Sequence, residues 1–257
     1  MDTGPLGMSL PRAYRKPRAA MTTALALPGF ELPEAVDHPA RYSAPILARL
    51  AELLDVEARA IGRPVVVLDV FAGAGGIHRL ARSNVSTVGL ELEMEWCAGS
   101  AGPTINGDAT RLPIRSETVD VVATSPCYGN RMADHHEARD SSRRITYRHM
   151  LGRPLSPGSA AGMQWGDDYR ALHLAAWAEA LRVLRPGGLL LCNVKDHTRE
   201  GVVMPVVLWH RSALAGLGFT IEAVEAVSTR GMRLGANREA RADGEAIIRA
   251  RKERGTR

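Results

Sequence analysis

The chain has 257 residues, of which 45% are hydrophobic and 24% charged, and its formal net charge is +5. This length allows one large or two small domains, and the composition is ordinary for a globular protein. No run of about 18 apolar residues occurs, which excludes a predicted membrane span, and the basic charge is compatible with a polyanionic partner.

The first 36 residues contain five prolines (Pro5, Pro11, Pro17, Pro28 and Pro33) and a basic cluster made of Arg12, Arg15, Lys16 and Arg18. We predict a disordered or loosely packed basic arm over residues 1–36, followed by one folded domain over residues 37–257. The apolar stretch that ends at Leu27 is too short and too interrupted for a signal peptide. Three widely spaced cysteines are typical of reduced thiols, so we expect a cytoplasmic protein.

Residues 46–60 place apolar side chains at helical spacing and predict a helix that Ser43 caps, with Pro45 in its first turn. A buried strand over 65–69 follows and ends in Asp69. It leads into a glycine-rich turn and then, by the spacing of Ile77, Leu80 and Ala81, into a helix. Glycine lets a backbone approach a ligand closely, and a helix start offers unpaired N–H groups.

A second strand over 85–91 ends in Glu91, which lies 22 residues after Asp69. This is near the offset of about 20 residues at which an acid reaches a ribose hydroxyl in a βαβ unit, so we predict a nucleoside-type cofactor. His78 stands where a dinucleotide fingerprint needs its third glycine, and no Gly-Lys-Ser/Thr follows. NAD and a phosphate-binding loop are therefore disfavoured. The alternative is a glycine-rich turn with no ligand.

Residues 104–109 predict a third short strand with Asp108 at its end, and Val119–Thr124 predicts a buried strand. That strand delivers Ser125, Pro126, Cys127 and Tyr128 to the sheet edge where ligands collect in α/β proteins. Further on, we expect a helix from Asp167–Asp168, as caps, to Leu184, ended by Arg-Pro-Gly-Gly. A strand over 189–194, a helix over about 203–217, and strands over 219–224 and 245–251 complete the chain.

The run Asp69-x-Phe71-x-Gly73-x-Gly75-Gly76 resembles motif I of S-adenosylmethionine (SAM) methyltransferases. Ser125-Pro126-Cys127-Tyr128 resembles motif IV of enzymes that methylate exocyclic amino groups of nucleobases, and residues 38–42 are similar to motif X of amino-directed DNA methyltransferases. The resemblance covers residues 37 to about 251. It implies an α/β fold of the Rossmann-like class I type, with a mostly parallel seven-stranded sheet and helices on both faces.

The resemblance implies a SAM site made of His38, Pro39, Tyr42, Asp69, Phe71, Ala72, Gly73, Gly75, Gly76, Glu91, Asp108, Ala109 and Ser125. Glu91 would bind the ribose and Asp108 the adenine amino group. The catalytic group would be Ser125, Pro126, Cys127 and Tyr128. No paired-ligand spacing predicts a metal.

An aromatic amine is a poor nucleophile, because its lone pair is delocalised into the ring. The residues of motif IV are suited to orienting such an amine. Ser125 Oγ and the Pro126 carbonyl would accept the two amino hydrogens and direct the nitrogen at a methyl sulfonium, while Tyr128 would stack on the base. Cys127 replaces the second proline of the family pattern. A Cys127 nucleophile, as in carbon-5 cytosine methylation, is disfavoured because that family has different flanking residues and a longer chain.

A polar, arginine-rich insertion over about 130–167 and a glycine-containing loop over 228–243 are predicted to contact DNA. The expected DNA contacts are Asn130, Arg131, Arg143, Arg144, Arg148, Arg233, Asn237 and Arg238. We therefore predict a methyltransferase that acts on a flipped-out DNA base, with N4 of cytosine favoured over N6 of adenine. The alternatives are an RNA or other-substrate N-methyltransferase and a non-catalytic DNA-binding relic. The sequence does not choose between monomer and dimer.

Overall fold

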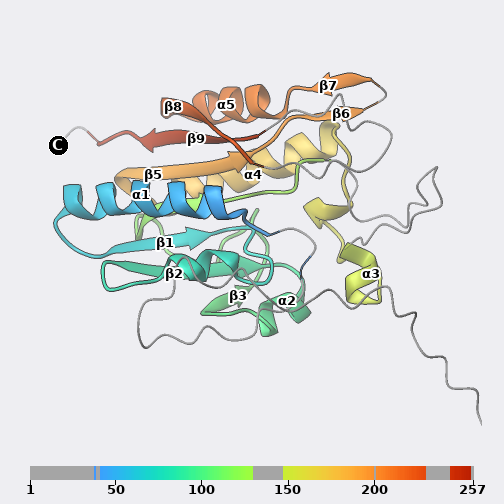
Figure 1. The fold of residues 1–257 in the computed structure, drawn as a ribbon, viewed down its shortest axis with the longest axis horizontal. Coiled ribbons are helices and arrows are strands. Elements are labelled where there is room, and N and C mark those ends of the chain that lie inside the picture. The colour runs from blue at the N-terminus through green and yellow to red at the C-terminus, as the bar shows by residue number, and fades with distance from the viewer. Residues whose placement is uncertain (1–37, 39–40, 130–146, 200, 230–243, 256–257) are drawn as a thin grey trace, which may run out of the picture. The chain divides into compact units, whose positions relative to one another are not determined.

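The computed structural model describes residues 38, 41–129, 147–199, 201–229 and 244–255. Its centre is a seven-stranded sheet in the order β3–β2–β1–β4–β5–β9–β8 (Figure 1). The strands are β1 (Val65–Asp69), β2 (Val85–Glu91), β3 (Thr104–Asn106), β4 (Val119–Thr124), β5 (Leu184–Val194), β8 (Phe219–Val227) and β9 (Glu245–Lys252). Only β9 runs antiparallel to its neighbours β5 and β8. The predicted mostly parallel sheet is confirmed.

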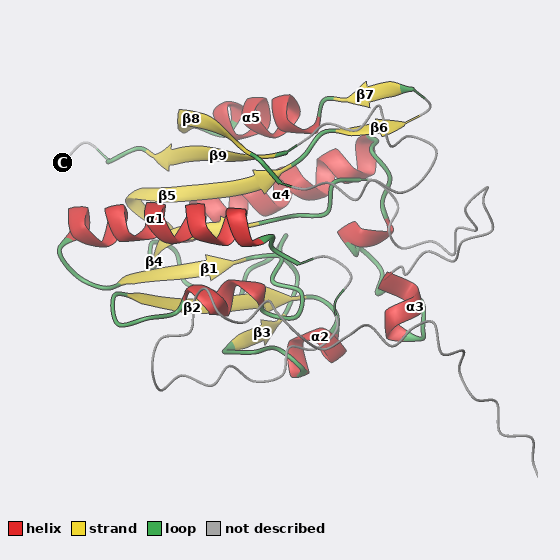
Figure 2. Ribbon diagram, in the orientation of Figure 1, coloured by secondary structure: helices red, strands yellow, loops and turns green. Residues whose placement is uncertain are grey.

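Five α-helices and two short 3₁₀ turns accompany the sheet in the described ranges (Figure 2). They are α1 (Ala44–Ile61), α2 (Met94–Ala98), α3 (Tyr147–Leu151), α4 (Asp167–Val183), α5 (Val206–Gly216), η2 (Gly76–Leu80) and η3 (Ala160–Gly162). A separate hairpin is formed by β6 (His197–Arg199) and β7 (Val202–Met204). None of the helices described here combines the length and the apolar character needed to cross a bilayer.

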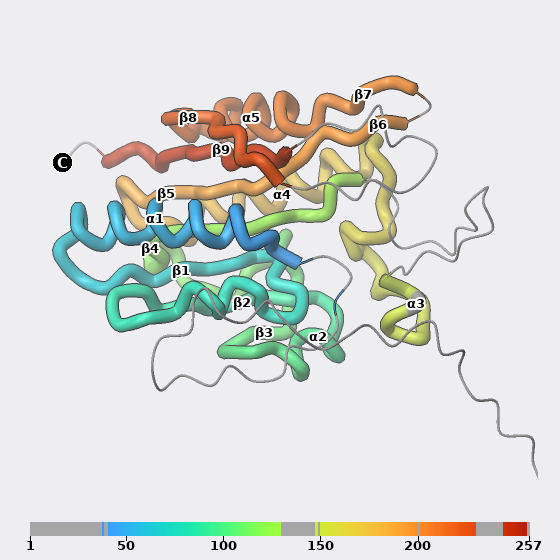
Figure 3. The backbone as a smooth tube through the Cα atoms, viewed as in Figure 1, coloured from blue at the N-terminus to red at the C-terminus, as the bar shows by residue number. Residues whose placement is uncertain are grey.

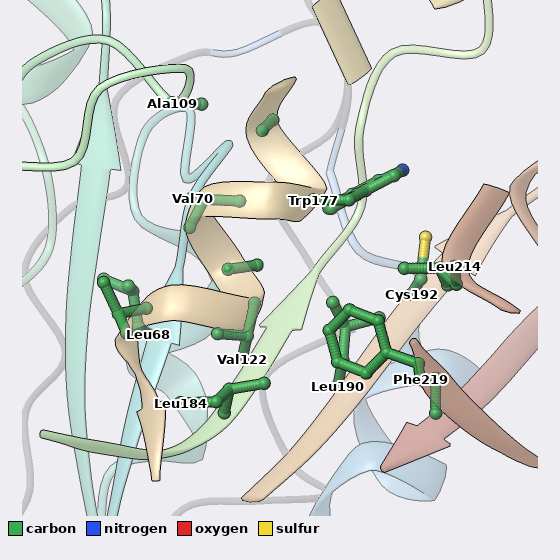
Figure 4. Close-up of a cluster of buried hydrophobic side chains, with 14 of the residues drawn as sticks. Leu68, Val70, Ala109, Val122, Trp177, Leu184, Leu190, Cys192, Leu214 and Phe219 are labelled. Atoms are coloured by element: carbon green, nitrogen blue, oxygen red, sulfur yellow. The ribbon is translucent and has the colours of Figure 1, made fainter. Parts of the chain in front are cut away.

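The pleat of the strands explains why helices cover both faces of the sheet, since successive side chains point to opposite faces. Val121 and Ala123 of β4 pack in one apolar cluster with α1, whereas Val122 packs in the other with α4 and α5. Figure 4 shows the second cluster, which includes Val122 of β4 and Trp177 of α4 and in which Leu214 of α5 lies beside Cys192 of β5. Both faces are therefore buried, as parallel sheets require.

The strand order reverses at β1. The chain runs outward from β1 through β2 to β3, then returns to place β4 on the other side of β1 (Figure 3). In open α/β sheets, ligands bind at the carboxyl ends of the strands where the order reverses. The loops after β1 and β4 are the two that carry the glycine-rich turn and the Ser-Pro-Cys-Tyr sequence. The topology therefore brings both motifs to one crevice edge.

Two predicted helices differ from the observed elements. The turn after Gly75 is followed by a single 3₁₀ segment over Gly76–Leu80 in place of the predicted helix. The segment expected as a helix over 203–217 is split at Pro205, which is the N-cap of α5. The preceding residues Val202 and Val203 join β7, as β-branched side chains favour.

The predicted helix caps are confirmed in part. Ser43 is the N-cap residue of α1, but it makes no side-chain cap bond, and its Oγ is buried without a partner in the described structure. Gly166, and not an aspartate, is the N-cap of α4. Asp167 and Asp168 lie in the first turn instead, where a negative charge is still favourable to the helix dipole.

The Arg-Pro-Gly-Gly sequence belongs to β5 and is not a loop before it. Leu184 pairs with Val119 and Leu189 pairs with Val121, so four residues of β5 bulge opposite one residue of β4. A Cβ atom on Gly188 would lie 2.8 Å from the Arg185 carbonyl oxygen, which explains the need for glycine there.

Candidate active site

Asp69, at the end of β1, is a buried carboxylate that connects the glycine-rich turn after β1 with the Ser-Pro-Cys-Tyr loop after β4. Its side chain has no exposed surface and accepts hydrogen bonds from Tyr42 Oη at 2.9 Å and Thr124 Oγ1 at 2.6 Å. The backbone N–H of Phe71 donates a third bond at 3.0 Å. Burial raises the pKa of Asp69 to about 6, and the three donors oppose that rise. Because Thr124 immediately precedes Ser125, this carboxylate fixes both loops.

The glycine-rich turn is packed against the segment before α1. Gly73 has φ of 54°, and a Cβ atom there would lie 2.9 Å from the His38 ring. A Cβ atom on Gly76 would lie 3.0 Å from the Tyr42 ring. The structure thus places His38 and Tyr42, both predicted cofactor residues, directly on the turn. Pro39, predicted with them, lies outside the described residues.

Glu91, at the end of β2, faces the same turn. Its two carboxylate oxygens each accept one backbone bond of 2.8 Å, from Gly73 N and Glu93 N. Burial raises its pKa to about 7, and the two backbone donors oppose this. Glu91 therefore titrates near neutral pH while it is hydrogen-bonded to the backbone of the glycine turn.

The remaining predicted cofactor residues surround this region. Asp108 is exposed just after β3, and its Oδ1 accepts 2.8 Å bonds from the N and Oγ1 of Thr110. Ala109 is buried in the core, as are Ala72 and the backbone of β1. The Phe71 ring packs 5.4 Å from that of His173 in α4. Asp108 is thus an exposed acid just beyond the carboxyl end of β3, and the neighbouring strand β2 ends in Glu91 at the same edge of the sheet.

The loop after β4 carries Ser125, Pro126, Cys127 and Tyr128, and we call it the acceptor loop. Two of its side chains belong to a hydrogen-bonded polar cluster that the sequence did not predict. Ser125 Oγ lies 3.2 Å from Tyr128 Oη, and Tyr128 donates to Glu245 Oε2 at 3.2 Å. Asn193 Nδ2 lies 3.2 Å from Ser125 Oγ and 2.7 Å from Glu245 Oε2. We call Ser125, Tyr128, Asn193 and Glu245 the Ser125 cluster. The one sequence signal for it was a polar Asn193 within an otherwise apolar buried strand.

The backbone on either side of Tyr128 is pinned from α4 and the residues before it. Tyr169 Oη donates to the Cys127 carbonyl at 2.8 Å, and Trp165 N donates to the Gly129 carbonyl at 2.8 Å. A Cβ atom on Gly129 would meet the Trp165 backbone at 2.9 Å. The acceptor loop is therefore held rigid although Cys127 replaces a proline.

His210 of α5 completes the support of Tyr169. The indole N–H of Trp177 can only donate, so the bond of 3.1 Å to His210 makes Nδ1 an acceptor and places the proton on Nε2. That Nε2–H then donates to Tyr169 Oη at 2.9 Å, which leaves the phenol proton for Cys127. Burial holds the pKa of His210 well below its usual value, so the ring stays neutral.

Cys127 lacks the properties of a nucleophile. Burial raises the pKa of its thiol to about 11, and its Sγ lies 3.7 Å from Tyr147 Oη. A reactive cysteine needs a stabilised thiolate at neutral pH. Carbon-5 chemistry through Cys127 is therefore disfavoured by its surroundings as well as by its sequence context.

Most of the predicted DNA contacts cannot be placed. Asn130, Arg131, Arg143, Arg144, Arg233, Asn237 and Arg238 lie outside the described residues. Arg148 is described and lies exposed on α3. Arg153, an arginine of the same insertion, instead binds Glu93 at 2.8 Å and Glu95 at 2.7 Å within the chain. Across the described ranges, no group of three or more His, Cys, Asp or Glu side chains could hold a metal ion.

No family model matches the chain, and no curated protein matches it. Solved structures do match. The [4+2]-cyclase SpnF is 18% identical over 86% of this chain and 89% of that one, with a TM-score of 0.51. The 1,6-didemethyltoxoflavin-N1-methyltransferase of Burkholderia thailandensis, solved with S-adenosylhomocysteine, is 16% identical over 82% and 80%, with a TM-score of 0.46.

A SAM-dependent methyltransferase of Methanosarcina mazei is 12% identical over 74% of this chain and 93% of that one, with a TM-score of 0.48. At these identities a structural likeness concerns the fold and does not transfer an activity. The fold predicted from the sequence is confirmed: the chain has a Rossmann-like α/β fold with a mostly parallel seven-stranded sheet and helices on both faces.

Proposed function

We propose that this protein transfers a methyl group from SAM to an exocyclic amino nitrogen of a DNA base, with N4 of cytosine favoured over N6 of adenine. The observation that carries the proposal is the bond of 2.6 Å between Thr124 and Asp69. It joins the glycine-rich turn, which suits a nucleoside cofactor, to the Ser-Pro-Cys-Tyr loop, which suits an amine. The bond supports a methyl donor site and a methyl acceptor site that would lie next to each other.

The residues at the glycine turn fit SAM. Gly73 and Gly76 let the turn pack closely beneath the His38 and Tyr42 rings, and the Gly73 N–H donates to the Glu91 carboxylate. The Glu91 carboxylate would accept from the ribose hydroxyls, and the exposed Asp108 would accept from the adenine amino group. Bound SAM would supply an electrophilic methyl sulfonium.

The acceptor loop would orient the amine. Ser125 Oγ and the Pro126 carbonyl would accept the two amino hydrogens and turn the nitrogen lone pair toward the methyl group. Tyr128 would offer a flat face to the base. A paired base in duplex DNA keeps its amine inside the helix, so the nucleotide would have to be flipped out.

Labelled SAM and nucleoside analysis test the proposal. The protein is incubated with duplex DNA, single-stranded DNA and RNA, and N4-methylcytosine, N6-methyladenine and 5-methylcytosine are separated by chromatography. We expect label in N4-methylcytosine from DNA. Label found in RNA alone, or in 5-methylcytosine alone, would contradict the proposal. Ser125→Ala should abolish transfer, and Glu91→Ala should weaken SAM binding measured by calorimetry.

A further inference from the structure

The Ser125 cluster gathers groups from three strands that lie far apart in the sequence. Ser125 and Tyr128 follow β4, Asn193 lies near the end of β5, and Glu245 begins β9. Asn193 is only 1% exposed, so its amide must find partners within the protein. The cluster therefore contains one carboxylate, two hydroxyls and one amide in mutual contact beside the proposed amine site.

The hydrogen bonds of this cluster run in one direction. An ionised carboxylate can only accept, so both Asn193 Nδ2, at 2.7 Å, and Tyr128 Oη, at 3.2 Å, donate to Glu245 Oε2. The Tyr128 hydroxyl has a single proton, and it uses this proton in its hydrogen bond to Glu245. Ser125 must then be the donor in its contact of 3.2 Å with Tyr128.

Glu245 also decides how the Asn193 amide is turned. The opposite orientation would place the amide oxygen against the carboxylate, and the observed one leaves Asn193 Oδ1 buried without a hydrogen-bond partner in the described structure. The same Nδ2 lies 3.2 Å from Ser125 Oγ. Ser125 thus accepts from Asn193 and donates to Tyr128, and its remaining lone pair is available to a substrate N–H.

We infer that Glu245 is the final proton acceptor of the methyl-transfer reaction, reached from the substrate amine through Ser125 and Tyr128. The inference rests on the proposed function, and it assigns to the last strand of the sheet a role in the chemistry at the β4 loop. Because Glu245 acts through two other side chains, it is a positioning and proton-accepting residue and does not contact the substrate.

The balance of the step is complete. The amine lone pair forms the N–C bond, the S–C bond breaks with its electron pair staying on sulfur, and the methylated nitrogen carries a positive charge. That nitrogen loses one proton to Ser125 Oγ, whose own proton moves to Tyr128 Oη, whose proton moves to Glu245 Oε2. The hydroxyls are restored, Glu245 becomes a neutral acid, and it later releases the proton to water.

Glu245→Gln tests the relay with little change of shape. We expect kcat to fall about 100-fold, the lower range for loss of a general base. The KM for DNA and the dissociation constant for SAM should stay within about twofold, because no substrate contact is removed. Glu245→Asp, which keeps a carboxylate, should restore part of kcat. Glu253→Gln makes the same change at an exposed residue just after β9 and should retain wild-type kcat.

Combining Glu245→Gln with Tyr128→Phe tests whether the two residues act in the same proton relay. If both residues serve one relay, the double variant should lose no more kcat than the worse single variant. Urea unfolding of the ligand-free proteins gives a readout without turnover. The two changes should again be non-additive, because both act on the one hydrogen bond from Tyr128 Oη to residue 245: Tyr128→Phe removes its donor and Glu245→Gln removes the charge of its acceptor.

Unchanged kcat in Glu245→Gln, or additive effects in both measurements, would overturn the relay while leaving the proposed function intact if the wild type methylates a base amine. A wild type that methylates no base amine would instead refute the proposed function, and the relay with it.

Discussion

Thr124 Oγ1 donates a hydrogen bond of 2.6 Å to Asp69 Oδ1, and this bond joins the carboxyl ends of the neighbouring strands β4 and β1. Both side chains are fully buried. The pairing of β1 with β4 aligns the two strands, but this side-chain bond fixes the loops that follow them. Any movement of the acceptor loop relative to the glycine turn must first break it.

Thr124→Val removes this donor and preserves the shape of the side chain. We expect the free energy of unfolding to fall by about 2 kcal/mol at pH 8, since a buried charged acceptor loses a partner. The loss should shrink at pH 5, because the pKa of Asp69 is about 6 and the group is then mostly protonated. Urea denaturation measures both values. Thr220→Val, at an exposed position of β8, is the control, and equal losses in the two variants would contradict the expectation.

Glu91 should make the ligand-free protein less stable as pH rises. Its pKa is about 7 in the folded protein, against an ordinary value of 4.5, because of burial. Between these two values the folded state binds more protons than the unfolded state, so stability falls as pH rises through the window. The shift corresponds to about 3 kcal/mol. Glu91→Gln should remove that part of the decline between pH 4.5 and 8 in urea denaturation, and an unchanged decline would refute the assignment.

The same deprotonation should favour SAM binding. An ionised Glu91 accepts hydrogen bonds from ribose hydroxyls more strongly than a neutral acid does. We expect the SAM dissociation constant measured by calorimetry to fall up to about tenfold from pH 6 to pH 8. In Glu91→Gln it should stay flat across this range. A wild-type dissociation constant that rises with pH would contradict this prediction.

The sequence predicted the strands that end at Asp69, Glu91 and Thr124, because β-branched runs followed by glycine, acid or proline are strong local signals. The right-handed parallel connections of an α/β unit then place those strand ends at one edge. The positions of the loops after β1 and β4 thus follow from local sequence patterns and from the topology. This is why the sequence could predict that the glycine-rich turn and the Ser-Pro-Cys-Tyr loop lie at the same edge of the sheet.

Glu245 and Asn193 could not be predicted in the same way. They meet because β9 pairs antiparallel with β5, with Val194 opposite Ala246 and Asn193 opposite Ile247. That register joins residues about fifty positions apart, and no local pattern sets it. Arg153 shows the same limit. No local pattern of the arginine-rich insertion pointed to a partner within the chain, yet the fold places the buried carboxylate of Glu93 beside this arginine.

Tyr169→Phe should separate the support of the acceptor loop from cofactor binding. The change keeps the ring but removes the proton donated to the Cys127 carbonyl and the acceptor of His210 Nε2–H. We expect kcat to fall about tenfold, with the SAM dissociation constant unchanged, because small misplacement of reacting groups is costly. Steady-state kinetics and calorimetry measure the two quantities. A matched loss of SAM affinity would show that the phenol supports the whole site and not the acceptor loop.

Arg153→Ala should loosen the segment that carries α3 without unfolding the domain. Glu93 is 1% exposed and would keep only its bonds of 2.9 Å from Ser156 N and Oγ. Because the Arg153 side chain is 36% exposed, we expect a loss of global stability of only about 1 kcal/mol. Local opening should be affected more, and amide hydrogen exchange over residues 147–162 should accelerate about tenfold. Arg211→Ala removes the same charge from an exposed position of α5 and should leave these rates unchanged. Equal exchange in the two variants would show that the Glu93 contact does not hold the segment in place.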